Sequence, residues 1–172
     1  MNTKLNKWIV AMGVAVASTS TFAASDTGSL GVGASVSNVC AIGGGYLSFG
    51  NVSLLVTQGV GVLATTYAAD AGHTVPVICT NGATAQITAD AGMYASGGSR
   101  RMASGANRLV YELYADAGRT TVLDSSTGAI SYTGTGTNQT VMIYGRISAA
   151  NLAGASSGDY DDTVALTITY TP

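Results

Sequence analysis

One stretch near the end of the chain decides the expected fold: TVALTITY, at residues 163–170. Apolar side chains at every second position alternate with small or polar ones, which is the period of a strand with one buried face. Only Thr171 and Pro172 follow this stretch. We therefore expect a sheet that ends on this strand, with no later strand to cover its open edge.

A second strand-like segment lies near the start of the chain: SLGVGASV, at residues 29–36. Its apolar positions alternate with glycine and serine. A sandwich that stops one strand short leaves a hydrophobic groove and an open sheet edge, and both must be filled if the protein is not to aggregate. A detachable apolar strand from a neighbouring copy would fill them, so the pattern predicts a self-polymerising fibre subunit. The alternative is an ordinary first strand of the same domain.

Short apolar runs recur between these two segments, separated by Gly, Asn, Asp and Ser. This spacing is typical of an all-β sandwich, and helical periodicity is absent after residue 23. No second domain is indicated. A Gly/Ser-rich loop is expected at 96–106, and 52–64 is left open between strand and loop. The predicted strands are 30–39, 46–49, 74–79, 83–89, 108–114, 129–133, 139–147 and 163–170.

Residues 1–23 have the pattern of a secretory signal peptide. Lys4 and Lys7 precede a short apolar core at 8–17, and Thr21-Phe22-Ala23 places small residues at the cleavage site. An uncleaved membrane anchor is the alternative, which we disfavour because a spanning helix needs about 20 apolar residues. The sequence therefore predicts export.

Cleavage after Ala23 leaves a weakly charged chain. Residues 24–172 contain five arginines, no lysine and nine acidic residues, for a formal net charge of −4. There is no basic patch, so nucleic-acid binding is not expected.

The two cysteines, Cys40 and Cys79, predict a disulfide in an exported chain. It would close a loop of about 40 residues, worth about 3–4 kcal/mol in the chain-entropy model. A metal site or a reactive thiol lacks partners, because His73 is the only histidine and no CxxC pair occurs.

Other polar residues give weak signals for chemistry. Asp159, Asp161 and Asp162 suggest either a turn or a calcium site, and the turn is favoured because the ligand spacing of a calcium loop is absent. Glu112 is the only glutamate, and His73 has no nucleophile elbow near it in the sequence. We therefore predict no enzyme activity and no cofactor.

A set of motifs runs in order through most of residues 24–172. It consists of Thr27-Gly28 before the alternating segment and Cys40, LSFG at 47–50, VPVIC at 75–79, Arg101-Met102, LVYELY at 109–114 with Asp116, VMIYGRI at 141–147, and GDYDDTV at 158–164. Behind a signal peptide, this set resembles the spore coat protein U domain family, and within it the major pilins of archaic, Csu-type chaperone–usher pili.

The resemblance implies an incomplete immunoglobulin-like sandwich that lacks its last strand. The chain would divide into a signal peptide at 1–23, an N-terminal donor-strand extension at 24–37 and a pilin domain at 38–172. Cys40 and Cys79 match the disulfide of the family. The implied donor residues are Leu30, Val32, Ala34 and Val36, and the implied acceptor groove is lined in part by Val164, Leu166, Ile168 and Tyr170.

The resemblance also implies the partners. A periplasmic chaperone would lend a strand to the groove, and at an outer-membrane usher the extension of the next subunit would replace it. The chain would pass through the periplasm into a surface pilus serving adhesion and biofilm formation. One alternative is a coat or surface protein of the same fold that fills its own groove as a monomer. Another is a tip adhesin, which would need a further receptor-binding domain.

Overall fold

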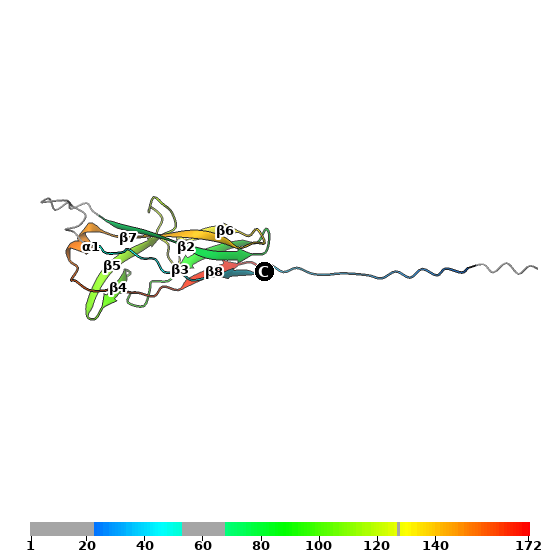
Figure 1. Cartoon of the computed structure of the whole chain (residues 1–172), viewed down its shortest axis with the longest axis horizontal. Coiled ribbons are helices and arrows are strands. Elements are labelled where there is room, and N and C mark those ends of the chain that lie inside the picture. Colours follow the sequence, from blue (N-terminus) through cyan, green and yellow to red (C-terminus); the bar gives the residue numbers. More distant parts are fainter. Residues whose placement is uncertain (1–22, 53–67, 127) are drawn as a thin grey trace, which may run out of the picture. The chain divides into compact units, whose positions relative to one another are not determined.

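The computed structural model describes residues 23–52, 68–126 and 128–172 (Figure 1). The chain forms two units, one ending at Ser35 and one spanning Val36–Pro172. The predicted signal peptide lies outside the described residues except for Ala23, as does nearly all of the 52–64 stretch. In the part of the chain that is described, no helix is long and apolar enough to cross a membrane.

The second unit is a sandwich of two antiparallel sheets (Figure 1). The larger sheet has the order β1-β2-β7-β5-β4 and the smaller one the order β6-β3-β8. The strands are β1 (Cys40–Ile42), β2 (Ala69–Cys79), β3 (Thr84–Ala89), β4 (Arg100–Ser104), β5 (Asn107–Tyr114), β6 (Ile130–Thr133), β7 (Gln139–Ile147) and β8 (Leu166–Tyr170), with one short helix, α1 (Ala149–Ala153). The predicted all-β, immunoglobulin-like class is confirmed.

Alternation along the strands builds the core between the sheets. In β3, for example, Ala85, Ile87 and Ala89 are buried while Thr84 and Gln86 face solvent. The buried residues form two clusters. The first is centred on β5 and β7 and includes Leu113 and Ile147. The second lies between the end of β2 and β3.

Two predicted strands are wrong. Residues 30–39 are not in a strand, because they pair with no sheet among the described residues, and β1 begins only at Cys40. Residues 46–49 are not a strand either, because Leu47 and Phe49 pack onto the core instead of joining a sheet edge. Gly145 of β7 makes room for them, since a Cβ there would lie 2.8 Å from the Phe49 Cζ and 3.0 Å from Leu47 Cδ2.

The predicted loop at 96–106 is also partly wrong, because it contains β4 and a buried arginine. Arg100 is only 4% exposed. Its guanidinium donates hydrogen bonds to the backbone carbonyls of Ala89, Asp90 and Leu123 and forms an ion pair with Glu112. Glu112 is thus half-buried and paired. Arg100 ties β4 and β5 to the end of β3 and to the segment around Leu123.

A second charged group lies on the outer face of the larger sheet. The Arg146 guanidinium donates two hydrogen bonds to the Asp70 carboxylate, at 2.7 and 3.0 Å. The Nε of Arg119 lies 3.3 Å from Oδ1 of the same carboxylate. The hydrogen bonds from Arg146 hold the pKa of Asp70 below its ordinary value. Asp70 therefore stabilises the fold above the unfolded-state pKa of about 3.9, and this contribution is lost as pH falls through the lower folded-state pKa.

We expect Asp70→Asn to reduce the loss of stability on acidification. Because the Asp70 side chain is 38% exposed, the effect should be below about 1 kcal/mol. The free energy of unfolding, measured by urea titration at pH 6 and pH 3, should fall less in this variant than in the wild type. Asp159→Asn, which changes an exposed aspartate, serves as the control. Equal falls in the wild type and Asp70→Asn would contradict the assignment.

Candidate functional site: an open groove between the sheets

The outer edge of β8 is not paired with any strand in the described part of the chain. β8 pairs with β3 alone. Just before β8, Ala165 exchanges hydrogen bonds with the backbone amide and side chain of Asp90, which places the polar groups of Ala165 on the β3 side. Because these groups alternate along a strand, the N–H and C=O groups of Leu166, Ile168 and Tyr170 point to the open edge.

The four residues implied as acceptor lining form one row along this strand. Val164, Leu166, Ile168 and Tyr170 are all half-buried, and the residues between them are exposed. The first two pack against the cluster on β5 and β7, and the last two against the cluster on β2 and β3. The row therefore faces the space between the sheets without being fully covered.

A groove opens beside the start of this row, with a volume of about 150 Å³. Its lining includes Val164 and Leu166 on one side, Leu47 and Phe49 on the other, and residues of the larger sheet as its floor. The floor residues are His73, Val75, Tyr111, Leu113 and Ile143. Alternation identifies Val75, Tyr111, Leu113 and Ile143 as inward-facing, whereas no signal in the sequence places His73 among them or shows that these positions meet at one groove.

One end of the groove is polar. The Tyr111 hydroxyl donates to Asp162 Oδ2 at 2.7 Å, and Asp162 Oδ1 accepts from the amides of Met93 and Thr163. Burial raises the pKa of Tyr111, and the hydrogen bond to Asp162 raises it further. Asp161 Oδ1 accepts from the Tyr46 hydroxyl at 3.3 Å. These aspartates therefore fix the chain that leads into β8.

No group of three His, Cys, Asp or Glu side chains arranged to hold a metal ion occurs among the described residues. His73, considered above as a catalytic residue, lies half-buried on β2 and packs against Gly45, where a Cβ would fall 1.9 Å from its Nε2. The close approach gives His73 a packing role at the groove.

On the opposite side of the sandwich, the segment before β8 is bridged to the edge of β4. The backbone amide of Ala103 in β4 donates to the carbonyl of Asp161 at 2.9 Å, and the amide of Asp161 donates back to Ala103 at 3.1 Å. The segment before β8 thus pairs with part of the edge of β4.

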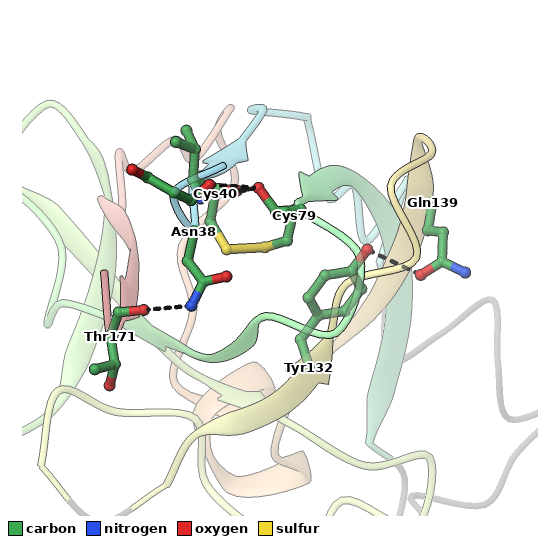
Figure 2. The surroundings of a disulfide bond; sticks show 9 residues. Asn38, Cys40, Cys79, Tyr132, Gln139 and Thr171 are labelled. Carbon is green, nitrogen blue, oxygen red and sulfur yellow. Dashed lines mark hydrogen bonds between the residues drawn. A yellow bond between two sulfur atoms is a disulfide. The ribbon is translucent and has the colours of Figure 1, made fainter. Parts of the chain in front are cut away.

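The predicted disulfide is present and joins β1 to β2 (Figure 2). Cys40 and Cys79 face each other in the register of the two strands. β1 has only three residues, so this bond supports a strand with few backbone hydrogen bonds of its own.

Replacing both cysteines by alanine is expected to lower the free energy of unfolding by about 2–5 kcal/mol, because the unfolded chain loses a cross-link. Urea titration of the oxidised protein and of the double variant measures the difference. The reduced wild type is the control and should resemble the double variant. A loss below about 1 kcal/mol would show that the bond contributes little.

The residues implied as donors are exposed. Leu30, Val32 and Val36 are 88%, 89% and 85% exposed, and Ala34 is exposed too. Their backbone is neither helix nor strand in this structure. Large apolar side chains in such a row are uncommon on a monomer surface and indicate a contact that buries them.

Comparison with known proteins supports the fold. The sequence at residues 26–167 matches the Spore Coat Protein U domain family. The P pilus rod subunit PapA has a similar structure, with a TM-score of 0.53 and 16% identity over 77% of this chain and 99% of that one. This likeness shows a shared pilin-type sandwich.

Two further structures are more distant. A chain of the CsuC–CsuE chaperone–tip adhesion subunit complex of Acinetobacter baumannii Csu pili aligns with a TM-score of 0.46 and 15% identity, over 77% of this chain and 40% of that one. This chain thus spans less than half of that chain's length. A chaperone–usher pilus structure aligns with a TM-score of 0.45 and 16% identity, over 88% of this chain and 100% of that one.

No curated protein matches the sequence. The family is one of structural proteins and not of enzymes. With 26–167 matched, the chain belongs to the Spore Coat Protein U domain family.

Proposed function

We propose that this protein is the structural subunit of a surface pilus that polymerises by donor-strand exchange and serves adhesion and biofilm formation. The observation that carries the proposal is that the protein has both an open sheet edge and an exposed strand-like segment. The half-buried row at 164–170 and the exposed row at 30–36 each span seven residues with apolar side chains at every second position. One extended strand matches the other in length and period.

The expected energetics favour insertion. Burying a Leu or Val side chain contributes about 1.5–3 kcal/mol, so Leu30, Val32 and Val36 together contribute on the order of 5–9 kcal/mol before entropy costs. The edge groups of β8 would gain backbone partners as well. An assembly of this kind dissociates slowly, which gives a fibre kinetic stability.

The segment between the extension and β1 favours a neighbouring copy as acceptor. The carbonyl of Ser37 accepts a hydrogen bond from Thr80 Oγ1, and the amide of Val39 donates to the same oxygen. To fill its own groove beside β1, the chain would have to reverse direction within these few residues and break both bonds. Insertion into another subunit leaves them intact.

The partners follow from the proposed mechanism and from the relatives. The Csu structure contains a chaperone, and its pili are described as archaic chaperone–usher pili. By analogy, a periplasmic chaperone would protect the groove of this subunit, and an outer-membrane usher would exchange the chaperone strand for the next extension. The predicted signal peptide and the disulfide suit transit through an oxidising periplasm to the cell surface.

The second candidate is a monomeric coat or surface protein that fills its own groove. The two are separated by running surface and periplasmic extracts on a denaturing gel, unheated and heated. A ladder of multiples that collapses to one band on heating indicates kinetically trapped strand exchange. A single monomer band in both lanes, from cells that also express the chaperone and usher, supports the self-filled monomer.

A further inference from the structure

The start of β1 and the end of β8 are joined by a single side chain (Figure 2). The Asn38 amide nitrogen, Nδ2, donates a hydrogen bond of 3.1 Å to the backbone carbonyl of Thr171, which directly follows β8. Asn38 itself lies two residues before β1. This bond therefore connects residues 133 positions apart in sequence, between the segment before β1 and the segment after β8.

The backbone around Asn38 is held from the other side. The residues before and after it are both hydrogen-bonded to Thr80, whose amide also donates to the Val39 carbonyl at 2.9 Å. Cys40, which follows Val39, is held by its disulfide with Cys79. Because its neighbours are anchored to β2, the Asn38 side chain is positioned to reach Thr171 with little loss of conformational freedom.

The spacing between β1 and β8 is too small for a further strand. Cα atoms of the two strands approach within 8 Å. Neighbouring strands lie about 4.8 Å apart, so a strand placed between β1 and β8 would need them about 9.5 Å apart. β1 and β8 must therefore separate before a strand fits along the whole open edge of β8.

We infer that Asn38 acts as a clasp, which holds the free subunit in a narrowed state and slows the uptake of a donor strand. This inference rests on the proposed donor-strand function. Breaking the bond to Thr171 raises the population of the widened state, and the observed uptake rate rises with that population.

The test measures uptake of a synthetic peptide with the sequence of residues 28–37, labelled with a fluorophore. The acceptor is the mature chain carrying Val32→Asp, which prevents it from using its own extension. In this background, Asn38→Ala is expected to speed peptide uptake about two- to tenfold, the range that corresponds to the loss of one hydrogen bond. Ser37→Ala, which leaves the Asn38 amide in place, is the matched control and should keep the original rate.

The outcomes separate the two proposals. Equal uptake rates with and without Asn38→Ala overturn the clasp and leave donor-strand exchange standing. No peptide binding to any variant overturns the proposed function, and the clasp with it. Should Asn38→Ala not fold, Asn38→Asp keeps the size of the side chain and removes the donor. It should show the same acceleration, together with faster hydrogen exchange at the amides of residues 166–171.

Discussion

Val32→Asp is expected to abolish the heat-sensitive ladder while leaving the monomer exported. Val32 lies in the middle of the apolar row of the extension and is 89% exposed in the free chain, so the substitution costs the subunit body nothing. Inserted in a groove, however, the new carboxylate would be taken out of water without a partner. The cost is several kcal/mol, comparable to the whole contribution of the apolar row.

The matched control is Ser35→Asp. It adds the same charge to the same segment, but on the face that alternates with the apolar row. This variant should polymerise, because its carboxylate stays in solvent when the strand is inserted. Normal fibres from Val32→Asp would disprove the donor assignment. Loss of fibres from both variants would indicate that a charge on either face of the extension prevents polymerisation. The assignment of the apolar row as the face that enters the groove would then be wrong.

Arg100→Ala is expected to destabilise the fold by about 3–5 kcal/mol, a large share of the 5–15 kcal/mol typical of a domain. The substitution removes a buried cation and leaves the carbonyls of Ala89 and Leu123 without their donor and Glu112 without its partner. The free energy of unfolding from urea titration measures the effect, and the mid-point should fall without a change in slope.

Arg108→Ala provides the comparison for this experiment. Arg108 lies on the neighbouring strand, is exposed and contacts only nearby carbonyls and the Tyr94 ring. Its removal should change stability by no more than about 0.5 kcal/mol. Arg100→Lys should also be strongly destabilising, because an ammonium cannot reproduce the planar set of donors. A loss below about 1 kcal/mol in Arg100→Ala would show that the interior relaxes around the gap.

The sequence predicts those elements in which alternation and burial coincide. β7 occupies the predicted range at 139–147, and β3, β5 and β6 lie within about one residue of prediction. The start of β2 was missed by five residues, because Ala69–His73 contains small and polar residues without a clear period. The disulfide follows from there being only two cysteines in an exported chain.

The remaining features depend on contacts between distant parts of the chain. A glycine- and serine-rich setting gives no sign that Arg100 is buried, because its partners come from three other segments. Leu47 and Phe49 alternate like a strand, yet they fill space that Gly145 leaves free. Five residues suffice for α1 because Ser148 accepts a hydrogen bond from the Asn151 amide, which is too local a signal for periodicity to detect.

The bridged edge at β4 has a consequence for how copies can be connected. In the described residues Asp161 and Ala103 bridge the edge of β4, and in the proposed exchange each subunit accepts one strand and donates one. In the vocabulary of polymer chemistry it is a bifunctional A–B monomer. Such monomers give linear chains without branches or cross-links, and the two ends of each chain are chemically different. A heterologous contact of this kind does not close on itself, so the length is set by the supply of subunits and not by the geometry.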